Sequence, residues 1–142
     1  MLERKEIESV LPHREPFLFI DRVVEIGDET GIAVRKVLPT EYYFRGHFPG
    51  EPVMPGVLLV EALAQLAGLV ELRRRRVPGR ICYLAGIDSA RFRSPVFPGD
   101  ILTLEAKLLK ARKRVAVAEG RARVGDRMVC EATLLLAYKG ER

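Results

Sequence analysis

The longest apolar run of the chain covers residues 57–72 and reads VLLVEALAQLAGLVEL. Leu, Ala and Glu are strong helix formers, so this run predicts a helix over Val57 to Arg76. Apolar residues occupy almost every face of that helix through Leu72, which is typical of a buried helix. Arg73 to Arg76 place positive charge at the carboxyl end, where the helix dipole favours it, and Pro78-Gly79 ends the helix.

Strand-like segments lie on both sides of this helix. Residues 17–26 and 32–38 are β-branched and aromatic, flank a glycine-bounded turn and so predict a hairpin. Four more strand-like segments follow the helix, at residues 80–92, 101–110, 115–124 and 128–138. A parallel doubly wound fold needs several helices, whereas residues 3–10 add only a short one. The sequence therefore predicts an α+β fold in which an antiparallel sheet wraps around one central helix.

Composition limits the class of protein. A length of 142 residues favours one domain over residues 1–142, and the net charge of +5 suggests an anionic partner: nucleic acid, membrane, or an acidic protein or cofactor. Cys82 and Cys130 each lie in an apolar run without metal-ligand spacing, which predicts small buried hydrophobes. The first residues lack the apolar stretch of a signal peptide, and the run at 57–72 is too short and polar to span a bilayer. We expect a cytoplasmic protein.

A loop rich in glycine and proline directly precedes the helix and carries a histidine. Residues 46–56 read GHFPGEPVMPG, and proline makes such a loop stiff. His47 in this loop is a candidate proton carrier near neutral pH, or else a histidine that only caps a turn. Glu61 is the one carboxylate in the early apolar run, and it faces either a cavity or solvent; Gln65, one turn on, is placed to orient it.

Gly56 adds a third candidate to the site. The amides at the start of a helix lack partners within the helix and can stabilise negative charge on an oxygen. Glycine there either lets a substrate approach the backbone or only serves the turn. Together with His47 and Glu61, it predicts removal of a proton beside a carbonyl and protonation of a leaving hydroxyl, which is dehydration of a β-hydroxy carbonyl compound.

Other function classes find less support in the residues. The run from Arg73 to Arg76 is either a solvated helix end or a nucleic-acid contact, and no nucleic-acid-binding motif accompanies it. His13 and His47 lie far apart without a metal-ligand pattern, which argues against a metal site, and we expect His13 to be a packing or interface residue. The sequence has no phosphate-binding loop and no GxSxG motif.

A series of different short motifs runs along nearly the whole chain. They are Leu11-Pro12-His13-Arg14, Pro16-Phe17, Asp21-Arg22-Val23, Gly46-His47-Phe48-Pro49-Gly50, Pro55-Gly56-Val57, Glu61-Ala62, Ala64-Gln65, Ala85-Gly86-Ile87-Asp88, Ala90-Arg91-Phe92, Pro95-Val96, Pro98-Gly99-Asp100 and Val129-Cys130-Glu131-Ala132. In these motifs, nearly the whole chain resembles the β-hydroxyacyl-acyl-carrier-protein dehydratases of type II fatty acid synthesis.

The resemblance implies a hot-dog fold and a homodimer as the catalytic unit, often assembled into a trimer of dimers. It implies His47 as the base and Glu61 of the partner subunit as the acid or water-handling group. It also implies the amide of Gly56 as a donor to the thioester carbonyl, Tyr83 as a tunnel gate and Phe92 as a wall of the acyl tunnel.

The activity implied is a lyase that needs no cofactor and no metal. It removes water from a (3R)-hydroxyacyl thioester carried on the phosphopantetheine of acyl carrier protein and leaves the trans-2-enoyl product. Acyl carrier protein is acidic, which suits the charge of +5, and Arg80, Arg91 and Arg93 are the docking candidates. Nucleic acid and membrane are not expected as partners. The alternatives are a hot-dog acyl-coenzyme A thioesterase and a non-catalytic acyl-binding module.

Overall fold

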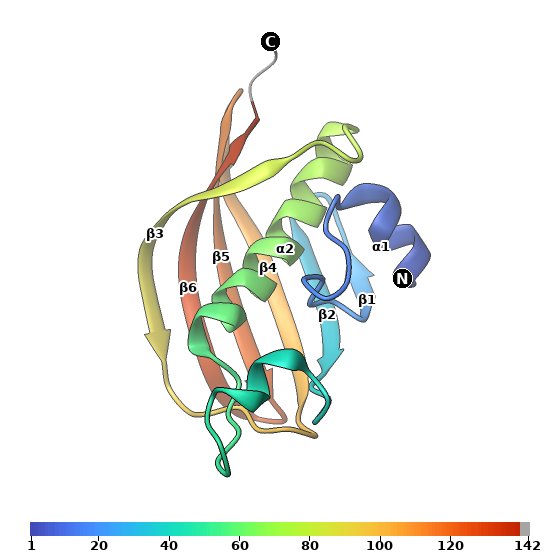
Figure 1. Cartoon of the computed structure of the whole chain (residues 1–142). Coiled ribbons are helices and arrows are strands. Elements are labelled where there is room, and N and C mark those ends of the chain that lie inside the picture. The colour runs from blue at the N-terminus through green and yellow to red at the C-terminus, as the bar shows by residue number, and fades with distance from the viewer. Residues whose placement is uncertain (140–142) are drawn as a thin grey trace.

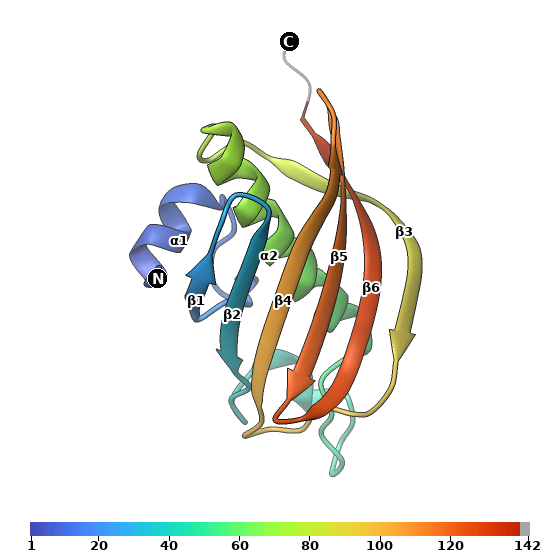
Figure 2. The ribbon, with the colours of Figure 1, turned by 180° about the vertical axis from the view of Figure 1, so that it is seen from behind.

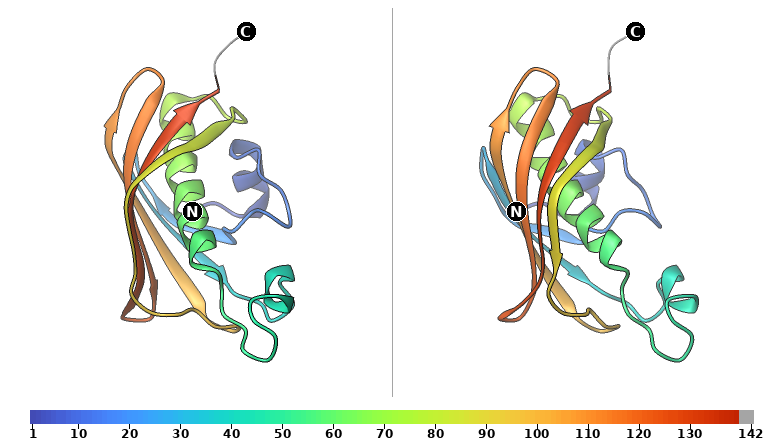
Figure 3. Two further views of the ribbon diagram at one scale, coloured as in Figure 1. Left: turned by 60° about the vertical axis from the view of Figure 1, so that its left-hand side comes forward. Right: turned by 90° about the vertical axis from the view of Figure 1, so that its left-hand side faces the viewer.

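The computed structural model describes residues 1–139 and contains one antiparallel sheet of six strands (Figure 1). The strands are β1 (Arg22–Ile26), β2 (Thr30–Lys36), β3 (Cys82–Phe92), β4 (Ile101–Ala111), β5 (Val115–Val124) and β6 (Arg127–Tyr138). Their order across the sheet is β1-β2-β4-β5-β6-β3, with every neighbouring pair antiparallel. Seen from behind and from the side, the sheet curves around one long helix (Figures 2 and 3). The sheet around one central helix is the fold that the sequence predicts, and it is the hot-dog arrangement that the resemblance implies.

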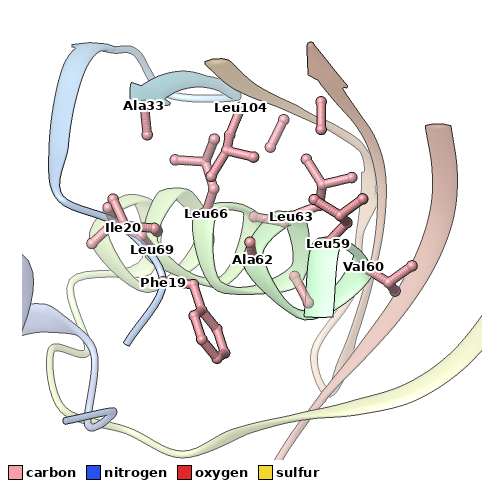
Figure 4. Close-up of a cluster of buried hydrophobic side chains, with 14 of the residues drawn as sticks. Phe19, Ile20, Ala33, Leu59, Val60, Ala62, Leu63, Leu66, Leu69 and Leu104 are labelled. Atoms are coloured by element: carbon pink, nitrogen blue, oxygen red, sulfur yellow. The ribbon is translucent and has the colours of Figure 1, made fainter. Parts of the chain in front are cut away.

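The central helix α2 covers Gly56–Arg75, as the apolar run predicts. Every residue from Leu59 to Leu72 is buried except Glu61, and the apolar side chains of α2 form the middle of the core (Figure 4). The helix ends at Arg76, which adopts a left-handed conformation with φ of 56°. The amides of Arg76 and Val77 donate to the carbonyls of Arg73 and Leu72, so two of the last carbonyls of the helix are satisfied.

Two glycines of the sheet allow α2 to lie close to the strands. A Cβ atom at Gly120 of β5 would come within 3.0 Å of the Leu63 side chain. A Cβ at Gly31 of β2 would come within 2.8 Å of Val70. Any larger residue at either position would push the helix away from the sheet, because core packing leaves no room for an added methyl group.

The predicted first hairpin is wrong in one part. We expected a strand from residue 17 onward, but residues 17–21 have no regular structure and β1 begins at Arg22. Leu18, Phe19 and Ile20 are fully buried all the same. The amide of Phe19 donates to the side chain of Gln65 on α2, 2.8 Å away, instead of to a neighbouring strand. A helix side chain therefore takes over the role of a strand partner.

Two short helices complete the described chain. Helix α1 covers Arg4–Val10 and buries Ile7 against the core, as the amphipathic start of the chain predicts. A 3-10 helix, η1, covers Tyr42–Arg45 and leads directly into the loop that holds His47. No helix among residues 1–139 combines the length and the apolar character needed to cross a membrane.

Candidate active site

The loop that carries His47 is fixed by backbone hydrogen bonds. The amide and carbonyl groups of Phe48 and Glu51 bond to each other and close a tight turn, in which Gly50 adopts a φ of 79°. The amide of Met54 donates to the carbonyl of Val96, 2.8 Å away, which holds the loop against the segment that precedes β4. The stiffness expected from the prolines is therefore reinforced by contacts made elsewhere in the fold.

His47 is oriented by its own loop. Its Nδ1 lies 2.8 Å from the carbonyl oxygen of Val53, and its backbone carbonyl accepts a bond from the Val53 amide. A carbonyl oxygen can only accept, so Nδ1 carries the ring proton and Nε2 keeps a free lone pair. The ring of Phe48 stacks on the imidazole, with centroids 4.0 Å apart. This geometry suits a general base that takes a proton at Nε2.

Glu61 lies on α2 and is held by the residue one turn later. Its Oε2 accepts a hydrogen bond of 3.0 Å from Nε2 of Gln65, so the orienting role predicted for Gln65 is confirmed. Gln65 is itself buried and also bonds the backbone of Phe17 and Phe19. The Glu61 side chain is 21% exposed, so it reaches the surface of a hollow and is not sealed in the core.

The hollow is a pocket of about 240 Å³ between α2, β3 and the segment that follows α1. Glu61 and Gln65 line it at one place, while Leu72, Arg80 and Tyr83 line it farther along. The wall is largely apolar with a few polar groups, which is the usual make-up of a small-molecule site. Tyr83 thus borders the pocket that contains Glu61, and its side chain is 54% exposed.

Gly56 and Phe92 meet at the start of α2. Gly56 is the first residue of the helix, so its amide has no carbonyl partner inside the helix. A Cβ on Gly56 would come within 2.9 Å of the Phe92 ring, so a larger residue there would have to displace the ring. The two residues, chosen separately from the sequence, therefore touch.

His47 and Glu61 stay separate within one protomer. Among residues 1–139, no hydrogen bond or ion pair joins them, and His47 does not line the pocket that contains Glu61. One protomer therefore does not bring the two predicted catalytic side chains into contact. Gly56 and Phe92 likewise lie outside the lining of that pocket.

The free edge of β3 is the most exposed apolar part of the sheet. The strand bonds to β6 on one side, and its other side pairs with no strand of the described chain. Tyr83, Leu84, Ile87 and Phe92 on this strand are all exposed, and Ile87 is 50% exposed. An apolar, unpaired edge of this length is a template for pairing with a second chain.

Sequence reasoning missed one contact in the site and one buried ion pair near it. His13, expected to pack or to lie at an interface, lines the pocket with its Nε2 3.6 Å from Oε2 of Glu61. Glu71 is fully buried near the carboxyl end of α2, where Arg74 and Arg75 both donate to its Oε1. Spacings of three and four residues to the two arginines were the available signal for Glu71. No sequence spacing links His13 to Glu61.

The prediction of a buried cysteine is confirmed for Cys130 but not for Cys82, which lines the pocket. Cys130 is fully buried, Cys82 is half-buried, and both are free thiols. Burial, with a smaller contribution from Glu71, raises the pKa of Cys82 to about 11. Residues 1–139 contain no cluster of three His, Cys, Asp or Glu side chains that could hold a metal ion.

Comparison with known proteins identifies the family of this chain. The model of the FabA-like domain matches residues 11–133. The 3-hydroxyacyl-acyl-carrier-protein dehydratase FabZ of Streptococcus pyogenes serotype M49 is 44% identical over 137 residues, which cover 96% of this chain and 98% of the relative. The FabZ of Pelotomaculum thermopropionicum is 44% identical over 140 residues, covering 98% of this chain and all of the relative.

Solved structures share the fold at low sequence identity. A chain of the dehydratase heterocomplex ApeI:P from Xenorhabdus doucetiae superposes with a TM-score of 0.81 at 17% identity, covering 95% of this chain and 91% of that one. A hypothetical thioesterase from Streptococcus pneumoniae, solved with coenzyme A, superposes at 0.64 with 19% identity, covering 85% and 87%. The fold alone therefore does not separate dehydratase from thioesterase, whereas the sequence does. The chain belongs to the FabA-like family and, within it, to the FabZ-type 3-hydroxyacyl-acyl-carrier-protein dehydratases.

Proposed function

We propose that this protein removes water from 3-hydroxyacyl groups carried on acyl carrier protein, as a lyase of fatty acid synthesis. The observation that carries the proposal is the bond from Nδ1 of His47 to Val53, which leaves Nε2 free to take a proton. The near full-length identity to FabZ enzymes supports the same reaction. The chemistry needs only acid and base groups, so neither a cofactor nor a metal takes part in it.

The proton balance assigns a role to each residue. Nε2 of His47 takes the proton from the carbon beside the thioester carbonyl, and that electron pair forms the new double bond. The carboxyl of Glu61 gives its proton to the leaving hydroxyl, which departs as water. The amide of Gly56 donates to the thioester oxygen while negative charge builds there. The proton on His47 returns to Glu61 through water, and the site is ready again.

A homodimer would bring the two residues together. The exposed apolar edge of β3 supports pairing with the same strand of a second copy around a twofold axis. Such pairing covers Tyr83 and Phe92 and makes them walls between two subunits, so we propose that one gates the acyl tunnel and the other lines it. Assembly of dimers into a hexamer and a cytoplasmic location stay predictions from the sequence.

The docking surface for acyl carrier protein is better supported at one end of the molecule than at β3. Among the three arginines chosen from the sequence, only Arg80 lines the pocket, and Arg93 is paired with Glu131 at 2.5 Å. Residues 73–76 and 112–114 lie together at the carboxyl end of α2, since Arg75 donates to the carbonyl of Lys113. This basic end, together with Arg80 on the wall of the pocket, suits an acidic protein that must insert a thioester.

The first test is an enoyl-thioester hydration assay, followed by ultraviolet absorbance, on wild type, His47→Ala and Glu61→Gln. General acid–base catalysis contributes about a hundred- to ten-thousand-fold per group, so each variant should lose at least about a hundred-fold in kcat while circular dichroism stays unchanged. Undiminished activity in either variant removes that residue from the mechanism. Release of free thiol from the acyl thioester without hydration would identify a thioesterase instead. Acyl binding without turnover in wild type would identify a binding module.

Mixing the two inactive variants tests the shared site. A random equal mixture makes about half of the dimers hybrid, and each hybrid has one complete site, so the activity should return to about a quarter of wild type. If both residues act within one protomer, no hybrid regains a complete site and the mixture stays inactive.

Docking is tested with two substrates. Replacing Arg112, Lys113 and Arg114 by serine should raise KM for the substrate on acyl carrier protein and weaken its salt dependence. The same variant should keep its rate with a small enoyl thioester that lacks the carrier. Arg121→Ser, on a different part of the sheet, is the matched control and should change neither value.

A further inference from the structure

We infer that His13 is a positioning residue for Glu61, an inference that rests on the proposed role of Glu61 as the acid. His13 belongs to the segment between α1 and β1, and Glu61 belongs to α2. Nε2 of His13 lies 3.6 Å from Oε2 of Glu61, and both residues line the same pocket. Fold topology alone brings these two side chains together.

Nε2 is the nitrogen of the His13 ring that meets a polar side chain. Its Nδ1 is buried and has no hydrogen-bond partner among residues 1–139. Arg14 donates to the carbonyls of Leu11 and His13, at 2.8 and 2.7 Å, and so holds the backbone of this segment. The polar edge of the ring that remains available is Nε2, and it faces Glu61.

The two oxygens of the Glu61 carboxyl have different surroundings. Oε2 lies between Nε2 of Gln65, at 3.0 Å, and Nε2 of His13, at 3.6 Å. Oε1 accepts no side-chain or backbone hydrogen bond from residues 1–139, and it is not sealed off from the pocket. Oε1 is therefore the oxygen that faces the leaving hydroxyl, while His13 and Gln65 together prevent the carboxyl from rotating away.

The charge state of His13 suits this role. Burial lowers the pKa of His13, the Glu61 carboxylate opposes that change, and the Arg14 guanidinium adds to it. A lowered pKa favours the neutral ring, which steadies the carboxyl without forming a full ion pair. A permanent cation beside Glu61 would stabilise the ionised carboxylate, which has no proton to give to the leaving hydroxyl. Arg80 is the other charged side chain that lines the pocket.

The test compares His13→Ala and His13→Gln with wild type in the hydration assay. A misplacement of about 1 Å at a reacting group costs on the order of a hundred-fold in rate, so His13→Ala should lose about ten- to a hundred-fold in kcat with KM changed less than about twofold. His13→Gln, whose amide can replace Nε2, should recover most of the loss. In a Glu61→Gln background, His13→Ala should cause no further loss.

A nuclear magnetic resonance titration of His13 needs no variant at His13. If the two groups interact, the pKa of His13 should fall when Glu61→Gln removes the carboxylate. An unchanged pKa, or losses from His13→Ala and Glu61→Gln that multiply, overturns the inference. If both His47→Ala and Glu61→Gln keep full activity, the proposed function itself fails. If they lose activity while His13→Ala keeps it, only the inference about His13 fails.

Discussion

Replacing Arg74 and Arg75 together should strongly destabilise the protein. The sequence alone favours a solvated helix end for these two arginines and gives no sign of such an effect. Both donate to Oε1 of Glu71, at distances of 2.6 and 3.0 Å. The Glu71 side chain is completely buried, whereas the two arginines are 32% and 24% exposed. Their removal therefore leaves a buried carboxylate without a cation.

The magnitude follows from that difference in exposure. Breaking a buried ion pair by deleting one partner costs about 3–5 kcal/mol. The arginines are partly solvated, which places the expected loss for Arg74→Met with Arg75→Met near the lower end, at about 3 kcal/mol. Each single variant leaves the other arginine on the same oxygen and should cost about 1 kcal/mol, so the double variant should exceed the sum of the singles.

The assay is urea unfolding at pH 7 and a fixed protomer concentration. Adding Glu71→Met to the double variant removes the unpaired charge and should restore most of the lost stability. Arg73→Met with Arg76→Met is the matched control and should stay within about 0.5 kcal/mol of wild type, because both side chains are exposed. Equal losses in the test and control pairs, or no recovery on adding Glu71→Met, would refute the buried-charge reasoning.

Three further predictions concern the site. Gly56→Ala places a methyl group 2.9 Å from the Phe92 ring, so thermal unfolding should show a loss of stability of about 1–3 kcal/mol. Adding Phe92→Leu should restore most of that stability. If it does not, the strain does not come from the Phe92 ring. Gln65→Leu leaves the buried Phe19 amide without a hydrogen-bond acceptor and removes the hydrogen bond to the Glu61 carboxyl. It should lower the free energy of unfolding in urea by about 2–4 kcal/mol and also lower kcat. Unchanged stability would contradict the observed bonds. Burial raises the pKa of Cys82 to about 11 from 9.0, so its thiol stays protonated at pH 8. Alkylation at pH 8, followed by mass spectrometry, should therefore be about a hundred-fold slower than for a cysteine in an unstructured peptide. Equal rates for the protein and the peptide would show that the thiol is not desolvated.

Local sequence determined the elements that a short stretch of chain can specify. The apolar run at 57–72 placed the central helix within one residue at each end, because helix formers and burial on all faces agree there. The four later strands were also predicted within about two residues, because turn residues separate them clearly. The order of β3 in the sheet was not determined, because pairing with β6 and not β4 depends on contacts far apart in the chain.

Where a residue is held by contacts with residues far away in the sequence, only the tertiary structure decided its conformation. Residues 17–21 have strand-like composition but bond to the side chain of Gln65. His13 faces Glu61 because the segment after α1 folds over α2, and no spacing in the sequence records that approach. His47 and Glu61 were identified from their types and surroundings, whereas the tautomer of His47 depends on the carbonyl of Val53. Residue chemistry is local and can be read from the sequence, but orientation comes from long-range contacts and needs the fold.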